Sequence, residues 1–197
     1  MSTDTGAMNV PEYPLRLEVE YPEQLNRWLP LVKWLLAIPH ALIVYALINV
    51  ASIIQFIAFF AILFTTKYPQ PLFEFVVNIY RWQMNLSAYI GLMRDEYPPF
   101  TWEPGQYPVT FEIDYPERLN RWMPLIKWLL ALPHYIVLTA LFIAAGVVWI
   151  IAFFAIIFTT RFPRGMFDFN VGVLRWWQRV NAYVYLMRDE YPPFSLK

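Results

Sequence analysis

The amino-acid sequence predicts an all-α integral membrane protein with two parallel helical-hairpin repeats, four transmembrane helices and short cytoplasmic β-strands. Three observations lead to this fold class: an apolar composition, a duplicated unit, and long apolar segments in each copy. Hydrophobic residues make up 58% of the 197 residues and aromatic residues 19%, well above the usual share in soluble proteins. A lipid environment is therefore expected.

The chain aligns with itself without a gap when it is shifted by 94 residues. Roughly half of the paired positions are identical, which is typical of a duplication. The clearest matches are Leu25–Trp28 with Leu119–Trp122, Lys33–Ala37 with Lys127–Ala131, and Arg94–Phe100 with Arg188–Phe194. We therefore divide the chain into a disordered N-terminal tail (residues 1–11), repeat unit 1 (12–100), a Pro/Gly linker (101–106) and repeat unit 2 (107–197).

Each unit begins with two Tyr-Pro pairs, at Tyr13 and Tyr21 in the first copy, and ends with Tyr-Pro-Pro-Phe, at residues 97–100. With these motifs the chain resembles the bacterial membrane proteins that carry domain of unknown function 4389. The resemblance covers nearly the whole chain, twice. It implies a membrane location and no particular biochemical activity.

A short strand is expected at the start of each unit. Apolar and polar residues alternate over residues 15–20 and again over residues 109–114, and this period of two is typical of a half-buried strand. The two strands could form a small sheet at the membrane surface.

An apolar stretch follows, from Trp28 to Phe64 and from Trp122 to Phe158. As one straight helix it would be about 55 Å long, which is much more than the ~30 Å hydrocarbon core. Pro39 and its equivalent in unit 2 favour a break. We therefore expect an interfacial helix through Ile38 and a spanning helix from about His40.

The third element of each unit, Leu72–Met93 or Phe167–Met187, is less apolar and carries a polar stripe along one face. The stripe could turn inward from a spanning helix, or the helix could lie in the membrane interface. Its residues are Glu74, Asn78, Arg81 and Asn85 in unit 1, and Asp168, Gly172, Arg175 and Arg179 in unit 2.

The basic residues favour four spans. With both helices of each unit crossing, nine basic residues lie on the side of the unit ends and three in the hairpin loops, in agreement with the positive-inside rule. The nine are Arg16, Arg27, Lys33, Arg94, Arg118, Arg121, Lys127, Arg188 and Lys197; the three are Lys67, Arg161 and Arg164. This predicts a multi-pass protein of the cell (inner) membrane, with both termini cytoplasmic and parallel units.

Arg81 and Arg175 are the strongest candidates for function, because an arginine near the bilayer centre is costly. They could line a path for an anion or another solute, or form ion pairs with Glu74 and Asp168. His40 and His134 occupy equivalent positions and could bind a shared haem or metal, although hydrogen bonding to carbonyls freed by the neighbouring proline is the simpler interpretation.

Other chemistry is disfavoured. The net charge is zero, which argues against nucleic-acid binding, and the absence of cysteine excludes disulfides and thiolate chemistry. Familiar catalytic and phosphate-binding motifs do not occur, so no cofactor or metal is expected. The Arg-Asp-Glu triplets at residues 94–96 and 188–190 are interpreted as the water-side ends of helices rather than as acid–base clusters.

We therefore expect a non-enzymatic structural or assembly subunit of a membrane complex, in contact with lipids and with other subunits or copies of itself. A small transporter or channel that uses the Arg81 and Arg175 stripes is the alternative. A haem-binding membrane protein that uses His40 and His134 is a more distant one.

Overall fold

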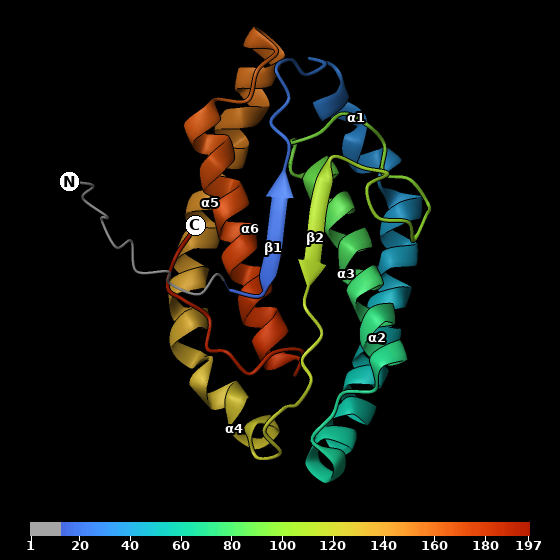
Figure 1. The fold of residues 1–197 in the computed structure, drawn as a ribbon. Helices are drawn as coiled ribbons and strands as arrows, with labels where there is room; N and C mark the ends of the chain where they lie inside the picture. The colour runs from blue at the N-terminus through green and yellow to red at the C-terminus, as the bar shows by residue number, and fades with distance from the viewer. Residues whose placement is uncertain (1–12) are drawn as a thin grey trace, which may run out of the picture.

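The computed structural model describes residues 13–197, which are mostly helical and contain a two-stranded sheet (Figure 1). The disorder predicted for residues 1–11 concerns a segment outside the described residues. In chain order the elements are β1 (Leu15–Val19), α1 (Leu29–Leu36), α2 (Ile38–Thr65), α3 (Gln70–Ile90), β2 (Val109–Ile113), α4 (Met123–Leu130), α5 (Leu132–Thr159) and α6 (Arg164–Val184).

Each long apolar stretch is divided into two helices, which confirms the predicted break. A single residue, Ala37, separates α1 from α2, and Pro39 lies in the first turn of α2. Proline is tolerated there because a first-turn N–H has no partner within the helix. Thr66 follows α2 in the left-handed region at a φ of 60°, and Thr160 follows α5 in the same way. The chain then reverses, and α3 and α6 pack back along α2 and α5.

The predicted strands also form, and they pair antiparallel at the centre of the molecule (Figure 1). Leu17 lies opposite Phe111, which is its equivalent 94 residues later. The ladder is symmetric about this pair, so a pseudo-twofold axis passes through it, perpendicular to the sheet. The axis relates the two repeat units, which therefore run in opposite directions.

The ends of the molecule show the same symmetry. The backbone N–H of Leu25 donates to the Thr160 carbonyl at 2.8 Å, and that of Leu119 donates to the Thr66 carbonyl at 2.8 Å. The start of each unit thus lies against the end of the other unit's long helix. Accordingly, α1 and α4 lie at opposite ends of the molecule (Figure 1). Along the long axis of the molecule the two units are therefore inverted, which differs from the parallel, upright units predicted from the sequence.

The elements form layers. α3 packs between α2 and β2, and α6 packs between α5 and β1. Side chains on the inner face of the sheet, such as Leu17 and Phe111, join the buried core. The outer face of the sheet exposes Arg16, Glu18, Thr110 and Glu112.

The prediction of four transmembrane helices is not supported. Within residues 13–197, only α2 and α5, with 28 residues each, are long and apolar enough to cross a membrane. The polar stripes make α3 and α6 less apolar, and these helices bury more than half of their residues against the sheet and the long helices. Arg81 and Arg175 in these stripes contact the sheet, which the prediction placed at the membrane surface.

Candidate membrane-facing surface

The most exposed apolar side chains belong to α2 and α5. In the most apolar window of each helix only 22% and 11% of residues are buried, whereas the core helix of a soluble protein would be mostly buried. Phe64 and Phe158 are 75% and 77% exposed. Together with the exposed side chains of α1 and α4, these residues form what we call the apolar surface. Its extent far exceeds the scattered apolar residues of a soluble monomer.

Tryptophans mark the two ends of the apolar surface. Trp28 and Trp34 from the α1 region, and Trp122 and Trp128 from the α4 region, are all largely exposed. The indole N–H of Trp34 donates to the Leu31 carbonyl at 2.8 Å, so its polar atom is satisfied within the helix. Exposed tryptophans of this kind are typical of a membrane–water interface.

Arg81 and Arg175 each donate a hydrogen bond to a backbone carbonyl at an edge of the sheet. Nε of Arg81 donates to the Phe111 carbonyl at 3.3 Å, and Nε of Arg175 donates to the Leu17 carbonyl at 3.0 Å. Each arginine therefore binds the central residue of the other unit's strand. The second contacts differ, because Arg81 donates to Oδ1 of Asn78 and Arg175 donates to the Leu196 carbonyl.

The other stripe residues have varied surroundings. Glu74 is exposed and accepts a hydrogen bond from Gln70, and Asp168 is exposed beside Arg175 in a pocket of about 340 Å³. Asn85 is buried. Arg179 is also buried and lies 5.7 Å from the Tyr13 ring centroid. Arg81 and Arg175 thus contact different strands of the sheet, and each lines a different pocket.

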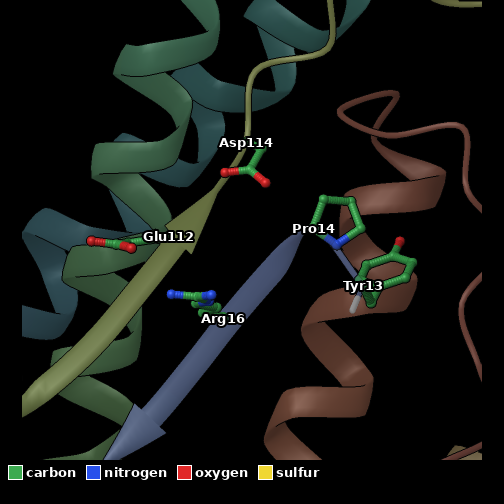
Figure 2. A pocket seen from close by; sticks show the side chains of 5 residues that line it. All are labelled: Tyr13, Pro14, Arg16, Glu112 and Asp114. Atoms are coloured by element: carbon green, nitrogen blue, oxygen red, sulfur yellow. The ribbon is translucent and has the colours of Figure 1, made fainter. Parts of the chain in front are cut away.

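A polar pocket of about 230 Å³ lies at one end of the sheet (Figure 2). Arg16 lies on the same face as its cross-strand partner Glu112, and Tyr13, Pro14 and Asp114 complete the lining. Thr110 occupies the position equivalent to Arg16 in unit 2. The basic side chain of this pocket is therefore specific to unit 1.

His40 and His134 are fully buried in the first turns of α2 and α5, within their own units. These two helices begin at opposite ends of the molecule (Figure 1). Each packs against aromatic rings, including Phe100 and Phe194 of the Tyr-Pro-Pro-Phe tails. Nδ1 of His134 accepts a hydrogen bond from the Trp176 indole at 3.1 Å, whereas neither ring nitrogen of His40 has a partner in the described part of the chain. The inverted arrangement keeps the two histidines from meeting at a shared haem or metal.

A buried lysine joins the start and end of each unit. Nζ of Lys33 lies 2.7 Å from the Asp95 carboxylate, donates to the Arg94 carbonyl at 2.7 Å and lies 5.1 Å from the Tyr89 ring centroid. The Asp95 carboxylate also accepts from the Asn26 backbone N–H. We call this group the lysine cluster. Unit 2 repeats it with Lys127, Asp189, Arg188, Tyr183 and Asn120.

Ionisation in the lysine cluster depends on its burial. Burial lowers the pKa of Lys33, and the contact with Asp95 partly offsets this. The neighbouring Arg94 pairs with Glu96 at 2.7 Å and donates to the Glu20 carbonyl. Burial raises the pKa of Glu96, but hydrogen bonds from Arg94 and from backbone amides outweigh it, so that the net pKa is lowered.

Sequence reasoning missed the lysine cluster, because it assigned Lys33 to an interfacial helix and interpreted residues 94–96 as the water-side end of another helix. A usable signal was present, since both copies keep the lysine and the aspartate at the same separation. Among residues 13–197, no three His, Asp or Glu side chains form a group that could hold a metal ion. Arg81, Arg175 and the two lysine clusters contact other parts of the same chain.

Comparison with known proteins confirms the resemblance drawn from the sequence. The family model for domain of unknown function 4389 (DUF4389) matches the chain twice, over residues 28–101 and 121–195. No curated protein and no solved structure matches the chain. The two matches cover well over half of the sequence, and the chain therefore belongs to the DUF4389 family.

Proposed function

We propose that the chain is a non-enzymatic membrane protein that serves as a structural or assembly subunit. The observation that carries this proposal is the apolar surface, because α2 and α5 leave most of their apolar side chains uncovered. Such a surface is costly in water and favourable in lipid. Lipids, other subunits or a second copy of the chain are the partners that fit it.

The polar residues support a structural role. Arg81 and Arg175 bind strand carbonyls, and each lysine cluster joins the start of a unit to its end. These groups already have partners within the fold, as expected of residues that hold a scaffold together. An enzyme would instead need a nucleophile, an acid or a base directed into a pocket.

We further propose that the protein belongs to the bacterial inner membrane and that both termini lie on the cytoplasmic side. Tyr13, the first described residue, lies beside β1, and the Leu196 carbonyl binds Arg175, whose Nε donates to β1. Both ends of the described chain therefore lie near the sheet. An assembly partner could contact the exposed polar face of the sheet, which the apolar surface leaves free.

Membrane fractionation tests the proposal. We expect the protein to stay in the membrane pellet after a carbonate wash, and the triple variant I53S/F56S/F60S on the exposed side of α2 to lower the pelleted fraction. The matched control R16S/E18S/E112S changes the sheet face and should leave the pelleted fraction unchanged. Release of the unmodified protein by carbonate would contradict the proposal.

Solute transport remains the alternative prediction, based on the arginine stripes. Flux into liposomes that is abolished in R81L/R175L, with the protein still folded, would favour it over the structural role. An equal flux in empty liposomes and in liposomes with the protein would count against it.

A further inference from the structure

We infer that the protein lies flat in one leaflet of the bilayer, with α2 and α5 parallel to the membrane plane and the β1–β2 sheet facing water. The inference rests on the proposed membrane role and specifies how the apolar surface contacts lipid. Its basis is the separation of apolar and charged groups onto opposite sides of the layered fold.

The first argument concerns the layers. α2 and α3 are antiparallel and packed along their length, and so are α5 and α6. An upright orientation would therefore carry α3, α6 and the sheet through the hydrocarbon together with α2 and α5. In a flat orientation only the layer of α2 and α5 enters the lipid.

The second argument concerns charge at the centre of the molecule. The pseudo-twofold axis passes through Leu17 and Phe111, so an upright molecule would have this pair at the bilayer midplane. The neighbouring side chains on the outer face of the sheet, Arg16, Glu18 and Glu112, are exposed. Charged side chains facing lipid at that depth are strongly unfavourable. In the flat orientation the same face lies in water.

The third argument concerns the basic residues at the ends. Because the units are inverted, each end of the molecule carries its own unit's basic residues and those of the other unit's hairpin loop. One end has Arg27, Lys33, Arg94, Arg161 and Arg164, and the other has Arg118, Arg121, Lys127, Arg188 and Lys67. The two sets are equal in number, so the positive-inside rule gives no preference for either upright direction. A flat orientation requires no such preference.

The dimensions also fit. An α-helix with its side chains is about 10–12 Å thick, and one leaflet contributes about half of the ~30 Å hydrocarbon core. The axis then runs along the membrane normal, so that α2 and α5 lie at one depth. The tryptophans of α1 and α4 reach the same interface from both ends.

Single cysteines in this cysteine-free chain test the orientation. Lys67 and Arg161 are exposed in the two hairpin loops at opposite ends, and Thr110 is exposed on the sheet. K67C, R161C and T110C are each treated with a membrane-impermeant maleimide in intact cells and in inside-out vesicles, with labelling in detergent as the measure of full reactivity.

A flat orientation predicts that all three thiols are labelled from the same side, within about twofold of one another. Labelling of K67C and R161C from opposite sides, or from both sides in a mixture, with T110C protected would overturn the inference and establish an upright orientation. Carbonate release of the protein would instead show that the proposed membrane role has failed, so the two failures are distinguishable.

Discussion

The two repeat units differ in the second hydrogen-bond acceptor of an equivalent arginine, Arg81 in unit 1 and Arg175 in unit 2. In unit 1 the second partner of Arg81 is the side chain of Asn78. In unit 2 a glycine, Gly172, stands at the position of that asparagine. Leu196 approaches so closely that a Cβ at Gly172 would lie 2.8 Å from the Leu196 carbonyl oxygen. The carbonyl takes the place of the missing amide and accepts from Arg175.

The lysine clusters, in contrast, are nearly identical in the two units. Lys33 and Lys127 lie at the same 2.7 Å from Asp95 and Asp189, and both contact a backbone carbonyl and a tyrosine ring. The comparison indicates that the contacts by which a buried lysine joins the start of each unit to its end can vary little. The contacts of the arginine beside the sheet can change, provided that its N–H groups are satisfied.

The largest expected effect is loss of a buried lysine. K33M leaves the Asp95 carboxylate without its cation and should lower the free energy of unfolding by about 3 kcal/mol. K127M should give the same loss, because the clusters match. Unfolding in detergent micelles measures both. Adding D95N to K33M should recover part of the stability, and clearly unequal losses in the two units would contradict the equivalence of the clusters.

Removal of residues 195–197 should have a smaller effect. It deprives Arg175 of the Leu196 carbonyl, and a lost hydrogen bond to a charged group costs about 1.5–3 kcal/mol. Introducing G172N into the truncated chain supplies the partner that unit 1 uses and should restore part of the loss, whereas G172A should not. Equal behaviour of G172N and G172A would show that the two solutions are not interchangeable.

The two histidines should respond differently to the same substitution. H134F leaves the Trp176 indole N–H without its acceptor and should cost about 1 kcal/mol. H40F removes two buried nitrogens that lack partners in the described residues, so it should leave the melting temperature unchanged or raise it. A loss in H40F as large as that in H134F would point to an unrecognised partner of His40.

The smallest expected effect is on acid stability. The net pKa of Glu96, like that of Glu190, is lowered from the usual 4.5. A carboxylate with a lowered pKa in the folded state stabilises above its unfolded pKa, and this contribution is lost as the pH falls below about 4.5. Melting temperatures between pH 6 and 3 should therefore fall less steeply in E96Q/E190Q than in the unmodified protein.

Much of the fold follows from local sequence patterns. The duplication, the break at Pro39, the alternating strands and the returning helix of each unit are all predicted, because each depends on residues close together in the chain. The relation between the two units is not local. The nine-to-three division of the basic residues assumes parallel units, whereas inversion moves the loops of one unit beside the ends of the other.

The candidate site was predicted only in part. The sequence singles out Arg81 and Arg175 because an arginine in an apolar helix needs a polar partner. Their partners, the Phe111 and Leu17 carbonyls, lie at the edges of strands from the other unit. The periodicity of polar residues in α3 and α6 does not show which backbone carbonyl each arginine will bind. Lys33 and Asp95 were identified as residues kept in both copies, without the contact that joins them.

Disulfide trapping in native membranes tests the inverted arrangement most directly. Glu18 pairs with Thr110 across the ladder, and cross-strand Cα distances of about 5 Å suit a disulfide. Glu20 and its equivalent Asp114 lie beyond opposite ends of the ladder, about 20 Å apart at ~3.3 Å per residue. We predict that E18C/T110C oxidises to a disulfide within one chain and that E20C/D114C does not. The reverse result would contradict the inversion and restore parallel units.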